Sequence, residues 1–320
     1  MLCDADRPWG AVSAVNGAIP DVWIVNDEAA ARALVSDGVC PIEAAYGVVS
    51  VVDELGFDHH GELSHLEPVA VRAWRDHYGV RADDPRFLVA GQLDADASFA
   101  MASLAGLVPG PHDPEADRVR TIVDTIGIID SDPIGRDLTT RPGFAEIWLW
   151  STLFSTGRPH LARQAVQGWG VITRRDPAML RPLLDAVAAD EQNRRFQAEQ
   201  DAQRSLYTSS DGRLTVLDRP ARWGFDVWYG RDEDQAAENP AAWRRQVVMI
   251  RSEAGTVTVG CPNKAVAERL FGNGGLRNVY PTLQPPGWGG REAVGGSPRG
   301  RGLSEEESVT AARMVTELLP

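Results

Sequence analysis

The segment Gly56-Phe57-Asp58-His59-His60-Gly61 places a carboxylate beside two adjacent imidazoles. Neighbouring side chains project in different directions, so one imidazole can bind a metal while the other contacts a metal-bound phosphate, and the carboxylate can orient a ring. An apolar run from Val48 to Val52 precedes the segment, which predicts that it follows a strand. This pattern indicates a metal and phosphate site, and an ordinary surface loop is the alternative interpretation.

Further carboxylates follow short apolar runs elsewhere in the N-terminal half. If residues 92–97 are extended, Asp94 and Asp96 lie on one side of the strand and can both reach a metal cluster. The alternative for Asp96 is a helix N-cap, and for Asp130, which precedes Pro133, it is capping or turn formation. Carboxylates with imidazole favour one or two Mn²⁺ or Mg²⁺ ions over a thiolate-bound metal. The predicted metal ligands are His59, Asp27, Asp53, Asp94, Asp96 and Asp130.

The elements that must position these residues have an α/β pattern. Apolar residues 21–25 are followed by an alanine-rich helical stretch over 28–35, and the short apolar run 87–90 precedes a helical composition over 97–107. Residues 64–78 also read as a helix. The acidic residues therefore cluster where strands end, which is where ligands bind in open α/β sheets.

Three regions are expected along the chain. A mainly parallel sheet flanked by helices is predicted for residues 1–175, followed by a helical connector over 176–212. Residues 213–320 are predicted to form a smaller α+β domain that binds substrate. Its short strands are expected at 214–217, 247–250 and 256–259, and its last helix is expected to begin near Ser304.

Glycines and arginines alternate in the C-terminal region, at 289–291 and 295–301. Such turns bring backbone amides close to a ligand, and arginine binds phosphate or carboxylate through its bidentate fork. Ordinary glycine-rich turns of a β domain are the alternative. The predicted substrate contacts are Gly290, Arg291, Ser297 and Arg299, with Arg301 as a further possibility.

Composition restricts the partners. The formal net charge of −13 argues against binding of long duplex nucleic acid, which is itself a polyanion. A small phosphorylated substrate or a short single-stranded oligonucleotide is expected instead. Three widely spaced cysteines suit neither a disulfide framework nor a zinc cluster, so a reducing cytoplasmic location is expected. The N-terminus lacks a signal-peptide pattern, and no stretch approaches the ~20 apolar residues of a membrane span.

The segment Phe57 to Gly61 resembles the signature of the DHH phosphoesterase superfamily, and residues 289–300 resemble its glycine-rich substrate-binding region. The resemblance extends to the expected architecture of most of the chain. At the level of sequence it is limited to these two segments. It implies that His59 binds metal, that His60 contacts phosphate and that Asp53 bridges metals.

The family's first motif, a histidine followed by aspartates, has two possible counterparts. The segment with Asp94 and Asp96 follows the signature instead of preceding it and has Gln92 where histidine is expected. The segment with Asp27 has the right order but also lacks the histidine. A later family aspartate corresponds to Asp124 or Asp130.

These observations predict a metal-dependent phosphohydrolase, similar to phosphodiesterases and exonucleases, that cleaves a small nucleotide or short oligonucleotide. Asp58 and His60 are the predicted catalytic residues. The alternative is a non-catalytic nucleotide-binding or regulatory protein on a degenerate DHH-like scaffold. A third interpretation is an enzyme that acts on a non-phosphate metabolite. Substrate, metal identity and oligomeric state stay open at this point.

Overall fold

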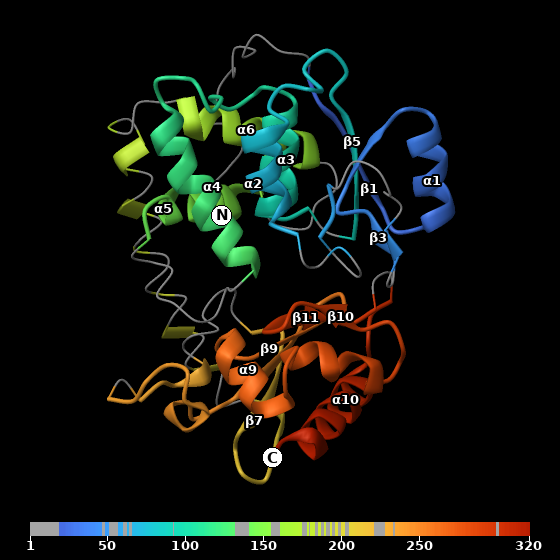
Figure 1. Cartoon of the computed structure of the whole chain (residues 1–320), viewed down its shortest axis with the longest axis vertical. Coiled ribbons are helices and arrows are strands. Elements are labelled where there is room, and N and C mark those ends of the chain that lie inside the picture. The colour runs from blue at the N-terminus through green and yellow to red at the C-terminus, as the bar shows by residue number, and fades with distance from the viewer. Residues whose placement is uncertain are drawn as a thin grey trace.

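The computed structural model describes residues 19–46, 49–50, 57–59, 63, 66–91, 93–131, 141–154, 161–174, 205–220, 228–232, 234–298 and 301–320, with further positions between 178 and 201. The fold is mixed α/β, with a three-stranded parallel sheet and a six-stranded mixed sheet. Buried apolar side chains of the two halves form separate clusters. Figure 1 shows the elements up to α6 on one side and those from β7 onward on the other, with β10 and β11 facing the N-terminal elements. The domain boundaries drawn from the sequence remain a prediction.

The parallel sheet has the order β1-β5-β2, with β1 at Asp21–Val25, β5 at Arg86–Ala90 and β2 at Cys40–Ile42. Strand β5 is central, and its apolar residues alternate between two faces. Leu88 packs with α1 (Glu28–Ser36), whereas Phe87 and Val89 belong to the larger helical core. The sheet is therefore covered on both faces, as a parallel sheet requires.

The sequence prediction placed a strand at Val48 to Val52, leading into the Asp-His-His segment. In the structure, β4 (Val49–Ser50) instead pairs with β3 (Ala45–Tyr46) in a two-stranded antiparallel ribbon. The third strand of the parallel sheet is β2, which contains Pro41. Proline lacks an N–H donor, and β2 can include it because β2 is an edge strand.

A layer of helices packs on the side of the sheet opposite α1. It comprises α2 (Val69–Asp76), α3 (Ala95–Leu104), α4 (Ala116–Ser131), α5 (Phe144–Phe154) and α6 (Ala162–Arg174). The central helix α3 is buried along nearly its whole length. The Trp150 and Trp169 rings stack with centroids 5.2 Å apart, and Trp169 donates a hydrogen bond of 2.9 Å to Ser98. This packing fixes α3, whose first turn contributes to the site described below.

The six-stranded sheet has the order β10-β11-β9-β8-β7-β6, in which only β7 and β8 are parallel neighbours. Helix α10 packs on β6 and β7, and α9 packs near the glycine-rich turns. The bounds are β6 Ser205–Thr208, β7 Leu214–Asp218, η4 Pro240–Ala242, β8 Val247–Arg251, β9 Val257–Gly260, α9 Lys264–Phe271, η5 Gly275–Asn278, η6 Tyr280–Thr282, β10 Gly289–Gly290, β11 Val294–Gly296 and α10 Glu305–Leu318.

The C-terminal sheet begins earlier than the sequence predicted. The sequence pattern predicts that the helical connector ends and the second domain begins at Asp211-Gly212. In the structure these two residues lie in the turn between antiparallel strands β6 and β7. Gly212 has φ +74, a conformation that glycine adopts readily in such turns. Described positions between 178 and 201 are helical, so the connector ends before β6.

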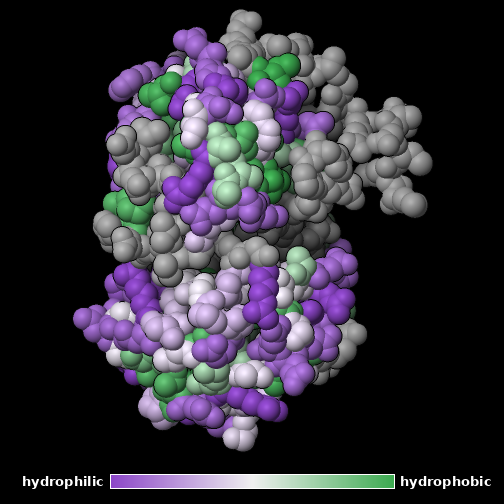
Figure 2. Space-filling model, turned by 90° about the vertical axis from the view of Figure 1, so that its right-hand side faces the viewer, coloured by the Kyte–Doolittle hydropathy of each residue, from purple (hydrophilic) through white to green (hydrophobic). Residues whose placement is uncertain are grey.

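Within the described part of the chain, no helix combines the length and apolar character needed to cross a membrane. Figure 2 shows a surface on which hydrophilic residues predominate over the C-terminal elements and apolar residues form small separate groups. Large exposed apolar side chains, such as Val80 and Phe196, are far apart in sequence.

Candidate metal centre

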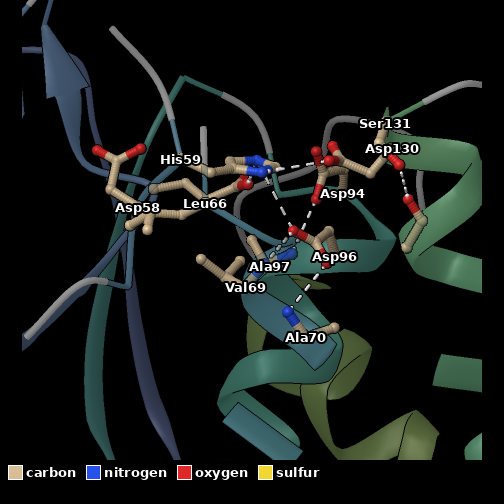
Figure 3. Close-up of polar contacts among 12 residues, drawn as sticks. Asp58, His59, Leu66, Val69, Ala70, Asp94, Asp96, Ala97, Asp130 and Ser131 are labelled. Atoms are coloured by element: carbon tan, nitrogen blue, oxygen red, sulfur yellow. Dashed lines mark hydrogen bonds and ion pairs between the residues drawn. The ribbon is translucent and has the colours of Figure 1, made fainter. Parts of the chain in front are cut away.

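Four side chains from four different segments converge at the side of the parallel sheet. Among the described residues, Glu43, His59, Asp96 and Asp130 each offer one ligand atom within 4.8 Å of the others. The His59 Nε2 atom lies 2.7 Å from Glu43 Oε1 and 3.8 Å from Asp96 Oδ2, and Nδ1 lies 3.3 Å from Asp130 Oδ2. Figure 3 shows the His59 ring directed toward Asp130 and Asp96, which lie on the same side of it. Both ring nitrogens therefore face carboxylates.

Glu43 reaches this cluster from the turn after β2. Its backbone has φ +49, which is uncommon for a residue with a side chain, and its N–H donates to the Phe57 carbonyl at 2.8 Å. The residue is 2% exposed. Such a conformation costs free energy and persists only where the surroundings hold it, often at functional sites. The hydrogen bond ties the Glu43 turn to the segment that carries His59.

Asp96 lies in the first turn of α3 and accepts hydrogen bonds from the start of α2. Its two carboxylate oxygens accept from the Val69 and Ala70 amides at 2.9 and 3.0 Å. Pro68, at the N-cap position of α2, makes no side-chain cap, so a carboxylate from another helix performs this role. The positive end of the α2 dipole therefore lies against this carboxylate.

Asp130 is in the last turn of α4, where the helix dipole disfavours a negative charge. Burial raises the pKa of its carboxyl well above the usual range, and Asp96 and Glu43 act in the same direction. His59 and Arg291 oppose this shift. The buried Oδ2 atom has no hydrogen-bond partner among the described residues, although it faces His59 and Arg291. The carboxylate is therefore placed where a bound cation would stabilise its charge.

Arg291 enters the cluster from the C-terminal half of the chain. Its Nη2 group contacts His59 Nδ1, lies 3.5 Å from Asp130 Oδ2 and donates to the Leu66 carbonyl at 3.3 Å. A guanidinium has only donors, so Nδ1 accepts this hydrogen bond and the ring proton resides on Nε2, facing Glu43. His59 is thus held with the Nδ1 lone pair directed at a cation.

The backbone of Arg291 belongs to a tight turn between β10 and β11, which we call the arginine turn (residues 291–294). The Arg291 N–H donates to the Val294 carbonyl at 2.7 Å, and the Tyr280 hydroxyl donates to the Arg291 carbonyl at 2.8 Å. A Cβ at Gly290 or Gly295 would collide with the turn backbone or with the Tyr280 hydroxyl. Glycine at these two positions is therefore needed for the close packing that aims Arg291.

Two of the predicted ligands have other contacts. Asp27 is the N-cap of α1 and accepts from Ala30 N at 2.8 Å, at an exposed position. Asp94 is the N-cap of α3 and accepts from Ala97 N at 2.9 Å. The expectation that Asp94 and Asp96 share one side of an extended strand is wrong, because the helix begins between them. The N-cap expected at Asp96 belongs to Asp94 instead.

The remaining predicted site residues lie apart from the cluster or outside the described residues. Asp58 is fully buried, and Figure 3 shows its carboxylate pointing away from the His59 ring. Ser297 accepts from Val257 N at 3.0 Å and so supports the edge of the C-terminal sheet. Gly290 shapes the arginine turn without offering a side chain. Asp53, His60 and Arg299 lie outside the described residues.

Sequence reasoning missed Glu43 and Arg72. Glu43 follows the short apolar run Val39 to Ile42, which is the same kind of signal that selected the other carboxylates and could have pointed to it. Arg72, on α2, donates to the carbonyls of Asp58 and Glu67 at 2.9 and 2.8 Å. Burial lowers the pKa of its guanidinium, with Arg291 acting in the same direction.

The donor set fits a divalent ion. Bonds of about 2.1 Å place neighbouring ligands about 3 Å apart and opposite ones about 4.2 Å apart, so small side-chain adjustments would suffice. Three carboxylates in one buried cluster repel one another when they are charged. A bound cation would offset that repulsion, so the four side chains could together hold a metal ion.

Comparison of the chain with protein-family models, curated proteins and solved structures finds no match.

Proposed function

We propose that this chain is a metal-dependent phosphohydrolase acting on a small phosphorylated substrate, such as a nucleotide or a short single-stranded oligonucleotide. The observation that carries the proposal is the convergence of Glu43, His59, Asp96 and Asp130 within 4.8 Å, beside the guanidinium of Arg291. Membership of the DHH phosphoesterase superfamily, suggested by residues 57–61, is part of the proposal.

Each residue has a distinct part. Asp96, fixed by the α2 amides, and Asp130 would hold Mn²⁺ or Mg²⁺ together with His59. A bound divalent ion supplies Lewis acidity and lowers the pKa of water toward neutrality, which provides a nucleophile for phosphorus. Glu43 Oε1, 2.7 Å from His59 Nε2, would orient the imidazole by accepting a hydrogen bond from its Nε2–H.

The arginines give the site its preference for anions. Arg291 reaches the cluster, and Arg72 borders it through the Asp58 carbonyl. Guanidinium groups bind phosphate oxygens in bidentate fashion. The net charge of −13 repels long polyanions elsewhere on the surface, which supports a small substrate.

The test is Mn²⁺-dependent product release from dinucleotides, cyclic dinucleotides, short single strands and pyrophosphate. Glu43→Gln and Asp130→Asn are expected to lower turnover at least a hundredfold. Asp27→Asn is the matched control, because it makes the same neutralising change at an exposed cap. Turnover that survives both site substitutions would refute the proposal.

One observation favours a second candidate, a non-catalytic nucleotide-binding protein. Arg291 already supplies a positive charge to His59 and Asp130, so anion binding would not require a metal. Saturable nucleotide binding without turnover, unchanged by a metal chelator, would identify this function.

A further inference from the structure

The Arg291 guanidinium contacts the same donor atoms that a divalent ion would use. Its Nη2 group faces His59 Nδ1, Asp130 Oδ2 at 3.5 Å and the Leu66 carbonyl at 3.3 Å. A lone pair, a carboxylate and a carbonyl are the oxygen and nitrogen donors of a cation site. The Arg291 guanidinium is therefore a cation of the protein itself that contacts the His59 Nδ1 and Asp130 Oδ2 side of the candidate metal centre.

Arg291 and a divalent ion cannot both contact His59 Nδ1 and Asp130 Oδ2. An ion bound to Nδ1 needs the lone pair that accepts the Arg291 hydrogen bond, and bonds of about 2.1 Å would put it in the space of Nη2. Their charges also repel at such separations in a site where Arg291 is only 16% exposed. Binding of the ion thus requires the guanidinium to leave.

The backbone of the arginine turn is held too firmly to provide that movement. All four of its carbonyls accept hydrogen bonds, from Tyr280 Oη, Leu276 N, Cys261 N and Arg291 N. These hydrogen bonds have donor–acceptor distances of 2.7 to 2.8 Å. The long arginine side chain, rather than the turn, is the part that can reorient.

We propose that Arg291 is a built-in competitor of the metal: a divalent ion displaces its guanidinium from His59 and Asp130, and the released side chain then contacts the anionic substrate. This inference rests on the proposed metal-dependent function. It adds that metal binding and exposure of Arg291 are coupled, so that the substrate-binding arginine becomes available when the ion is in place.

The first test is the Mn²⁺ affinity, measured by calorimetry in the absence of substrate. Arg291→Ala is expected to bind Mn²⁺ at least tenfold more tightly than the wild type, because the competing cation is gone. Arg269→Ala, on the exposed side of α9, removes the same charge from the same half and should leave the affinity within twofold.

The outcomes separate the two proposals. Equal or weaker Mn²⁺ binding by Arg291→Ala, with Mn²⁺ binding by the wild type intact, overturns the competition and leaves the phosphohydrolase proposal standing. Absence of Mn²⁺ binding in every variant overturns both.

A second test uses the unaltered chain, so it does not depend on how a variant folds. Phenylglyoxal modifies accessible arginines, and mass spectrometry of peptides can follow Arg291 and Arg269 separately. Addition of Mn²⁺ is expected to increase the modification rate of Arg291 at least threefold and to leave that of exposed Arg269 unchanged. An unchanged or lower rate at Arg291 under saturating Mn²⁺ would overturn the proposal.

Discussion

Replacing Asp96 with asparagine tests whether this carboxylate holds α2 as well as facing the candidate metal. Both of its oxygens accept backbone hydrogen bonds, at 2.9 Å from Val69 N and 3.0 Å from Ala70 N, and the residue is 2% exposed. Asparagine keeps one acceptor and turns an NH₂ group toward a backbone N–H. The substitution therefore removes one hydrogen bond and leaves a buried donor without an acceptor.

The expected magnitude follows from these contacts. A hydrogen bond to a charged acceptor contributes roughly 1.5–3 kcal/mol, and the interaction with the start of the α2 dipole adds about 0.5–1 kcal/mol. Relief of repulsion from Glu43 and Asp130 returns about 1 kcal/mol. We expect Asp96→Asn to lower the free energy of unfolding of the N-terminal half by about 1–3 kcal/mol.

The assay is urea unfolding in the presence of EDTA, combined with amide hydrogen exchange of Val69 and Ala70. Asp94→Asn is the matched control, because asparagine caps a helix about as well as aspartate, and we expect a change below about 0.5 kcal/mol. If the two variants have the same stability, and the two amides exchange as in the wild type, Asp96 does not hold α2 and the reasoning is refuted.

Three further predictions concern groups outside the site. The Ser209 hydroxyl and the Arg213 amide hold the pKa of Asp211 at about 2, below its value of about 3.9 in the unfolded chain, so its stabilisation is present above pH ~4 and is lost as the pH falls toward 2. Since the side chain is 39% exposed, Asp211→Asn should cost about 1 kcal/mol at pH 7 and nothing near pH 2; urea unfolding across this range would reveal a pH-independent difference if this is wrong. Burial raises the pKa of the Cys40 thiol to about 11, although Arg81 opposes the shift, so iodoacetamide at pH 8 should modify it about a hundredfold more slowly in the native chain than in urea. Similar rates in both conditions would contradict its burial. Ser304→Ala breaks the capping box of α10, in which Ser304 and Glu307 exchange hydrogen bonds of 2.9 and 3.1 Å, and should lower the stability of the C-terminal half by about 1 kcal/mol in thermal unfolding, with Ser304→Thr retaining most of it.

The geometry around Arg291 also explains the glycine-rich segment. The sequence suggested that Gly290 and its neighbours bring backbone amides toward a ligand, whereas in the structure they make room for the Tyr280 hydroxyl and for a closely packed turn. Their contribution to the site is indirect, because they fix where the arginine side chain begins. A ligand contact of Arg291 itself stays a prediction.

The sequence by itself determined the elements whose signals are local. Strand β1 at residues 21–25 follows from its apolar run, helix α1 from the alanine-rich stretch after Asp27, and helix α10 from the helical pattern that begins near Ser304. It also selected four candidate site residues that meet in the structure, namely His59, Asp96, Asp130 and Arg291. These signals depend only on neighbours along the chain, so they can be read without a fold.

Only the tertiary structure decided which of these residues meet. Arg291 and His59 are 232 positions apart, and Glu43 reaches the cluster from the turn after edge strand β2. Asp94 and Asp96 differ by two positions, yet one caps its own helix and the other caps α2, because packing of α3 against α2 directs the second carboxylate inward. Such choices depend on packing between distant segments, for which no local pattern exists in the sequence.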